Sequence, residues 1–355
     1  MQHTGGSLPT SPLHALHEAA GARFVDFGGW TMPVQYEGVL AEHGAVRKAV
    51  GVFDISHLGR LEVAGQGAPE LLRSQLCNDI SRIEPGRAQY TMALNDKGGI
   101  EDDIIVWQLD TQRFWVMPNG TNFEGISARF RSAAPLGVEV SDIRASTALL
   151  AVQGPAAPDV IDSVLGATPG RFRTLTAEFS GHRVIVAGTG YTGESGGELC
   201  IPIAGAEALW KSLVGAGATP AGLGARDTLR LEMGYPLWGQ DLDANASPLE
   251  AGLGWVVAWD HDFVGKSALE EQRGSLAKQL IAFSTEGRAI PRHGYPITAG
   301  ASVGTVTSGN FSPTLQHGIG LGYVSPPPGD DTDIAVTIRG KAVHAERESL
   351  PFVVK

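Results

Sequence analysis

Two adjacent aspartates, Asp102 and Asp103, lie between the turn-forming sequence NDKGG and an apolar run, IIVW. A carboxylate in such a place could stabilise a developing positive charge or orient a proton transfer on a ligand. Successive strand residues point to opposite faces, so only one of the two aspartates can face a given pocket. The residues that follow on each face are apolar, so the spacing does not choose between them. The alternative is that these carboxylates cap N–H groups of the turn.

Residues 188–193 read GTGYTG after an apolar strand-like stretch, which matches the G-x-G-x-x-G pattern of dinucleotide-binding turns. That turn must open a helix, because the pyrophosphate sits on the helix N-terminus. Here the next residues, ESGGELCIPI, carry two more glycines and then a strand-like alternation. We therefore predict a glycine-rich β-hairpin connection, whose backbone can approach a ligand closely. Residues 265–267, GKS, are no Walker A motif, because Asp260 stands where its first glycine is required.

Tyr191 and Glu198 lie in or beside this connection. A carboxylate such as Glu198 can accept two parallel N–H bonds from a planar edge, for example the amino-pyrimidinone edge of a pterin. The alternative for Glu198 alone is a solvated strand residue. His57 has no metal-ligating partner four residues away and no cysteine companion. We expect a packed or hydrogen-bonded histidine there, and no metal site.

The elements that must position these residues alternate between helix and antiparallel strand, which predicts an α+β protein rather than a doubly wound parallel sheet. Residues 53–65 are expected to form one strand with a turn at its end. From Lys278 onward, short strands separated by Gly, Pro, Ser and Asn predict a small all-β barrel or sandwich. The helical patterns are 13–22, 38–50, 122–134, 155–166 and 206–217, and the strand patterns before Lys278 are 53–65, 88–94, 100–109, 113–118, 146–154, 182–190 and 197–205.

Composition narrows the class of protein. The 355 residues carry a formal net charge of -11, which disfavours nucleic acid and anionic membranes as partners. No apolar run reaches the roughly 18 residues needed to span a bilayer, and the first residues do not resemble a signal peptide. Cys77 and Cys200 are the only cysteines, so a disulfide framework is not expected. We therefore expect a cytoplasmic enzyme.

An ordered set of segments resembles the aminomethyltransferase, or T-protein, of the glycine cleavage system, a folate-binding family. The resemblance runs from about residue 11 to 345, and its most specific parts are PAGLGARDTLRLE and TSGNFSPTL. It implies two ferredoxin-like α+β lobes within residues 1–275 and a small β-barrel within 276–355, arranged as a three-domain cloverleaf around a central folate channel. The matching segments are 24–36, 52–59, 86–107, 149–155, 190–199, 220–243, 247–257, 262–266 and 307–315.

The resemblance also implies the reaction. An aminomethyl group on the dihydrolipoyl arm of the H-protein passes to tetrahydrofolate, ammonia is released, and 5,10-methylenetetrahydrofolate forms. Tetrahydrofolate is thus the co-substrate, and a lipoylated H-protein is the partner. Asp103 is implied as the catalytic carboxylate near the reactive folate nitrogens. The implied folate contacts are Tyr90, Asn119, Tyr191, Glu198, Arg226 and Tyr235.

Several positions depart from the family pattern and leave other functions open. Leu58 replaces a common methionine, Glu101 an apolar residue, and residues 116–122 differ from the usual sequence. The main alternative is a tetrahydrofolate-dependent demethylase of a small O-, N- or S-methyl compound. A non-catalytic folate-binding assembly factor is disfavoured, because Trp238 stands where that relative has a reactive cysteine.

The remaining expectations concern residues outside the reacting centre. Trp30, Trp238 and Trp255 are expected to pack in the core or at an interface, or else to line the channel. Arg288 and Arg292 are candidates for a carrier-docking surface.

Overall fold

The computed structural model describes residues 8–287, 289–330 and 332–354. These fold into two compact units. The first contains the described residues up to Ala68, together with Ile83–Gln89 and Ile105–Arg226. The second contains Pro69–Arg82, Tyr90–Ile104 and the described residues from Asp227 onward. Neighbours in sequence such as Gln89 and Tyr90 therefore belong to different units.

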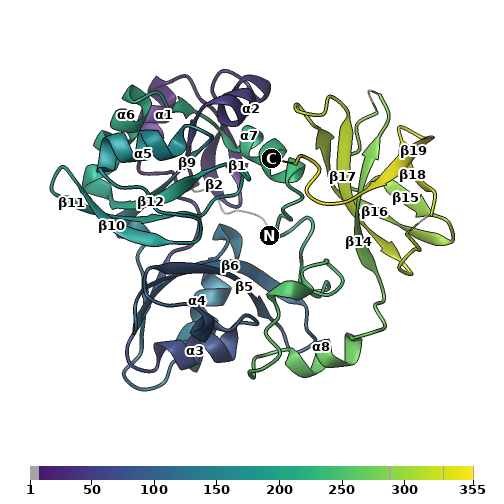
Figure 1. Cartoon of the computed structure of the whole chain (residues 1–355), viewed down its shortest axis with the longest axis horizontal. Helices are drawn as coiled ribbons and strands as arrows, with labels where there is room; N and C mark the ends of the chain where they lie inside the picture. Colours follow the sequence, from purple (N-terminus) through teal and green to yellow (C-terminus); the bar gives the residue numbers. More distant parts are fainter. Residues whose placement is uncertain (1–7, 288, 331, 355) are drawn as a thin grey trace. The chain divides into compact units, whose positions relative to one another are not determined.

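A six-stranded sheet forms the core of the first unit. Its strands are β3 (Gly51–Asp54), β9 (Thr147–Gln153), β10 (Thr174–Phe179), β11 (His182–Ala187), β12 (Gly196–Pro202) and β13 (Thr219–Pro220). Their order is β10-β11-β12-β9-β3-β13, and only β13 runs parallel to its neighbour. Helices α5 (Ala157–Leu165) and α6 (Ile203–Gly215) pack on β9 and β12 (Figure 1). The side chains of Ile161, Leu199 and Leu209 belong to this hydrophobic core.

A second sheet has five strands in the order β5-β6-β7-β4-β8. Their bounds are β4 (Leu61–Ala64), β5 (Arg87–Leu94), β6 (Ile100–Asp110), β7 (Arg113–Met117) and β8 (Glu139–Asp142). A separate hairpin pairs β1 (Arg23–Phe27) with β2 (Trp30–Gln35). Its turn residues Gly28 and Gly29 have φ of 58° and 83°, and two positive φ values suit a tight hairpin turn. The other helices of the first unit are α1 (His14–Ala19), α2 (Val39–Lys48), α4 (Phe123–Ala133), η2 (Gly120–Asn122) and η3 (Arg144–Ser146).

The C-terminal part of the second unit is a closed six-stranded barrel in the order β14-β17-β16-β15-β18-β19 (green to yellow in Figure 1). The strands are β14 (Gln279–Thr285), β15 (Pro296–Ala299), β16 (Ser302–Phe311), β17 (Gly318–Ser325), β18 (Ile334–Ile338) and β19 (Lys341–Glu348). Ile281, Phe283 and Val336 fill its interior. The remaining helices are α3 (Ala68–Gln75), α7 (Leu223–Glu232), α8 (Lys266–Gln272), η1 (Ile80–Arg82) and η4 (Gly254–Val256).

The prediction of a mixed α+β chain with a C-terminal barrel is confirmed. The expectation of a single strand over residues 53–65 is wrong, because β3 and β4 belong to different sheets. The chain turns between them where the Leu58 N–H donates to the Ile55 carbonyl and the Gly59 N–H donates to the Pro118 carbonyl. Within the described ranges, no helix is long and apolar enough to cross a membrane.

A buried carboxylate, Asp54, connects the N-terminal segment to β3. The Ser11 hydroxyl donates to Asp54 Oδ2, and His17 Nε2 lies 2.8 Å from the same oxygen. The Ser56 N–H donates to Oδ1 at 2.9 Å. Burial by itself would raise the pKa of Asp54, but these hydrogen bonds and the His17 charge outweigh it and lower the pKa. The ionised carboxylate therefore contributes stability to the folded state.

We expect Asp54→Asn to lower the free energy of unfolding at pH 7 by about 3–5 kcal/mol, because it leaves buried donors without their charged partner. Since the folded pKa lies below the unfolded value, the contribution of Asp54 is present above about pH 4 and is lost as the pH falls further. Urea unfolding of both proteins between pH 3 and 7 should show the difference narrowing at the acid end. Asp162→Asn, at an exposed position of α5, is the control and should change stability by less than about 0.5 kcal/mol. A difference between wild type and Asp54→Asn that does not vary with pH would contradict the assignment.

Candidate functional site

The glycine-rich segment 188–195 connects two antiparallel strands, β11 and β12, as predicted. No helix follows it, so it lacks the donor array that a dinucleotide pyrophosphate requires. Its glycines have a packing cause. A Cβ at Gly188 would lie 2.1 Å from the Gly170 carbonyl oxygen, and one at Gly190 would lie 2.0 Å from Oε1 of Gln153. Close packing of this connection against its neighbours therefore explains Gly188 and Gly190, two of the three glycines of the motif.

We expect Gly190→Ala to destabilise the protein by about 1–3 kcal/mol, because the added methyl group must displace the buried Gln153 amide. Thermal unfolding measures the loss. Gly215→Ala is the matched control, because a Cβ at this helical position would meet no atom within 4 Å. It should be neutral or slightly stabilising. Equal melting temperatures for wild type and Gly190→Ala would contradict this prediction, because they would show that the Gln153 side chain moves aside at no cost in stability.

One group of site residues gathers in the first unit around Arg226, in α7. The guanidinium carbon of Arg226 lies 4.8 Å from the centroid of the Tyr191 ring, a cation–π contact. Burial lowers the pKa of Arg226, and the nearby Glu198 and Tyr191 oppose that shift. Glu198, on β12, is only 8% exposed, and the Thr189 hydroxyl donates to its Oε2. Tyr191, Glu198 and Arg226 thus form an aromatic, an anionic and a cationic group side by side.

Two buried nitrogen atoms in this group have no hydrogen-bond partner within the described part of the chain: Nη1 of Arg226 and Nδ1 of His57. Burial and the Arg226 charge lower the pKa of His57 to about 3, so its imidazole is neutral at physiological pH. Asn119 immediately precedes the short helix η2, and a Cβ at the next residue, Gly120, would lie 2.4 Å from the His57 carbonyl oxygen. A polar ligand group or an ordered water would satisfy these two atoms.

A second group lies in the second unit around Asp103. Asp102 is fully buried while Asp103 is partly exposed, so the structure distinguishes two residues that spacing leaves equivalent. The Tyr90 hydroxyl donates to Asp103 Oδ2 at 3.1 Å. The Trp255 ring stacks on Tyr90, with centroids 6.0 Å apart and planes at 28°. The Asp103 carboxylate is thereby held beside an aromatic surface.

The seven predicted site residues divide between the units. Asn119, Tyr191, Glu198 and Arg226 belong to the first, and the last three of these are brought together. The second unit holds Tyr90, Asp103 and Tyr235, of which Tyr90 and Asp103 are in contact. Tyr235 follows α7 and is partly exposed, with its backbone carbonyl accepting from Arg230.

Of the three positions expected for Trp255, the structure excludes the core and leaves the interface and the channel lining open. Trp255 is 71% exposed and so is not core packing, whereas Trp238 packs against the core of the second unit. Arg292 donates to Asn310 Oδ1 at 3.0 Å on the barrel, and Arg288 lies outside the described residues.

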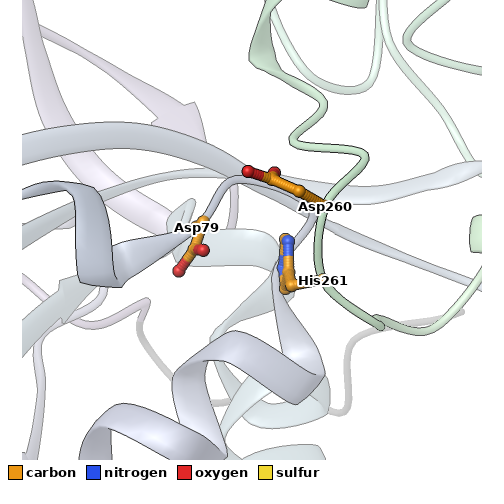
Figure 2. A group of neighbouring side chains, drawn as sticks. All are labelled: Asp79, Asp260 and His261. Carbon is orange, nitrogen blue, oxygen red and sulfur yellow. The ribbon is translucent and has the colours of Figure 1, made fainter.

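Among the described residues, Asp79, Asp260 and His261 form a group that could in principle hold a metal ion (Figure 2). Both carboxylates, however, already have a cationic partner. Arg73 Nε lies 2.8 Å from Asp79 Oδ1, and Arg82 Nη2 lies 2.6 Å from Asp260 Oδ1. These guanidinium groups offset the negative charge that would attract a metal ion. The arrangement favours an ion-pair cluster over a cation site.

Comparison with known proteins gives the family. The family model described as the GCVT N-terminal domain matches residues 13–261, and the glycine cleavage T-protein C-terminal barrel domain matches residues 278–353. The aminomethyltransferase of Frankia alni is 47% identical over 357 residues, 98% of each chain. That of Rubrobacter xylanophilus is 46% identical and covers 98% of this chain and 95% of its own. The crystal structure of glycine cleavage system aminomethyltransferase T from Bartonella henselae aligns with a TM-score of 0.90 at 34% identity over 98% of both chains.

The chain therefore belongs to the aminomethyltransferase family of glycine cleavage T-proteins. It is an enzyme, a transferase of the glycine cleavage system. The two expectations that the resemblance raised first, the family and its reaction class, are confirmed.

Proposed function

We propose that this chain transfers the one-carbon unit of S-aminomethyl-dihydrolipoyl H-protein to tetrahydrofolate, with release of ammonia and formation of 5,10-methylenetetrahydrofolate. The observation that carries the proposal is the Tyr90–Asp103 contact, because it places a carboxylate at a partly exposed position beside the Tyr90 ring, on which Trp255 stacks. Such a carboxylate suits a reaction in which a folate amine becomes cationic as it attacks carbon.

We assign the chemical step to Asp103. A folate nitrogen bonds to the methylene carbon while the bond from that carbon to the amino nitrogen breaks, and the amino group leaves as ammonia. The second folate nitrogen then displaces the dihydrolipoyl sulfur, which leaves as a thiol. Asp103 stabilises the positive charge on the attacking nitrogen and orients the proton transfers, without forming a covalent bond. The Tyr90 hydroxyl fixes the carboxylate through its hydrogen bond.

We assign folate recognition to the other six residues. Glu198 accepts N–H bonds from the amino-pyrimidinone edge of the pterin, and Thr189 orients its carboxylate by donating to Oε2. Arg226 takes an anionic group of the ligand through its Nη1, which the described residues leave without a partner. Flat parts of the ligand stack on aromatic rings. The residues of this proposed set are Tyr90, Asn119, Tyr191, Glu198, Arg226 and Tyr235.

The finer architecture is part of the same proposal and rests on the family resemblance. It comprises a folate-binding region of two ferredoxin-like lobes within residues 1–275 and a barrel domain within 276–355, as a cloverleaf with a central folate channel.

An isotope experiment tests the proposed donor and acceptor. Lipoylated H-protein carrying a ¹³C-aminomethyl group is mixed with the enzyme and tetrahydrofolate, and the product is followed by NMR. The label should appear in the methylene carbon of 5,10-methylenetetrahydrofolate. Label that stays on the H-protein, together with transfer from a methylated small molecule, would instead support a folate-dependent demethylase.

A further inference from the structure

The connection 188–195, which carries Tyr191, is held by a buried ion pair from a distant helix. Arg47, in the last turn of α2, donates through Nη1 to the Thr192 carbonyl at 2.7 Å and to Glu194 Oε1 at 2.9 Å. The two side chains are only 10% and 8% exposed. An ion pair so shielded from water is costly to break, because either charge would be left without compensation.

A neutral side chain holds the same connection from the sheet. Gln153, the last residue of β9, is fully buried. Its Nε2 donates to the Thr189 carbonyl at 3.2 Å, and its Oε1 accepts from the Thr192 hydroxyl at 2.8 Å. Tyr191 therefore lies between two anchored residues, and its ring meets the Arg226 guanidinium.

We propose that Arg47, Glu194 and Gln153 are positioning residues for folate binding, which hold residues 189–195 in the conformation that presents Tyr191 to the ligand. The inference rests on the proposed role of Tyr191 in tetrahydrofolate binding. A segment with glycines at 188, 190, 193 and 196 has many accessible backbone conformations. Fixing it before the ligand arrives removes the entropy cost of ordering it on binding.

The test compares tetrahydrofolate binding and turnover in Arg47→Met and Glu194→Gln with wild type. Each variant should raise both the Kd and the KM for tetrahydrofolate by about tenfold. Its kcat at saturating folate should stay within about twofold of the wild-type value. The double variant should be no worse than Arg47→Met, because removing the Arg47 guanidinium already removes its contact with Glu194. Arg47→Lys keeps the charge at Thr192 and Glu194, and should restore most of the affinity.

Arg113→Met is the matched control. It removes the partly exposed Arg113–Glu62 ion pair of the five-stranded sheet, in the same unit. It should lower thermal stability without changing the Kd for tetrahydrofolate. Glu194→Gln is isosteric, so it can still be measured if Arg47→Met does not fold. In Glu194→Gln, the backbone amides of residues 189–195 should exchange hydrogen faster than those of wild type.

The outcomes separate this inference from the proposed function. Wild type that does not bind tetrahydrofolate would refute the proposed function itself. Wild type that binds, with variants that lose stability but keep its Kd, would overturn the positioning role alone. A fall in kcat without a change in KM would also contradict the positioning role, because residues that hold the binding site in place affect the affinity for tetrahydrofolate.

Discussion

Asp103→Asn is expected to lower kcat for ammonia release by about 10²–10⁴-fold, the range typical of removing a positioned acid–base or charge-stabilising group. The amide keeps the shape of the side chain and can still accept the Tyr90 hydroxyl hydrogen bond. It carries no negative charge, however, and so cannot stabilise the cationic folate nitrogen. The Kd for tetrahydrofolate should stay within about threefold of wild type, because the loss occurs in the transition state. Steady-state kinetics and a binding titration measure both.

Glu101→Gln is the matched control for this prediction. Glu101 lies two residues before Asp103 on β6 and so points to the same face of the strand. Removing its charge should change kcat by less than about threefold if the role belongs to Asp103 alone. Near-normal turnover in Asp103→Asn would refute the assignment, and an equal loss in both variants would mean that the charge of the whole face matters.

Arg226→Met is expected to weaken tetrahydrofolate binding by roughly 30- to 4,000-fold, since truncating one member of a desolvated charged group costs about 2–5 kcal/mol. Two effects add. The ligand loses the donor Nη1, and Glu198, only 8% exposed, loses its nearby cation. A binding titration at low and high salt measures the change. Arg226→Lys should rescue it only in part, because an ammonium group lacks the planar fork and stacks less well on Tyr191.

Arg183→Met serves as the control for Arg226→Met. Arg183 is an exposed arginine on β11 of the same unit, and it donates to the Thr176 hydroxyl at 3.4 Å. It should leave the Kd for tetrahydrofolate unchanged. If Arg226→Met and Arg183→Met bind equally well, Arg226 is a structural residue of α7 and not a ligand contact.

Local patterns in the sequence predict the elements that depend on near neighbours. The strand character after Gly196 argues against a dinucleotide turn from the sequence alone, and the structure shows the predicted hairpin between β11 and β12. The short, turn-separated strands after Lys278 likewise predict the barrel. The β1–β2 hairpin, which is absent from the strand patterns above, has a local signal in its Gly28-Gly29 turn.

Other features depend on partners that are remote in the sequence, so spacing cannot reveal them. Arg47 and Glu194 are 147 residues apart, and nothing in either local pattern indicates their ion pair. Local sequence does not show which of Asp102 and Asp103 is buried. Packing in the second unit decides this, because it buries the face of β6 that carries Asp102. The stacking of Trp255 on Tyr90 likewise needs the fold, since the two are distant along the chain.

The most direct test of the central claim is ammonia release from aminomethylated, lipoylated H-protein by the purified enzyme, with and without tetrahydrofolate. The proposed function predicts fast release only when tetrahydrofolate is present, with one 5,10-methylenetetrahydrofolate formed for each ammonia. Absence of release from a protein that still binds tetrahydrofolate would contradict the proposed donor.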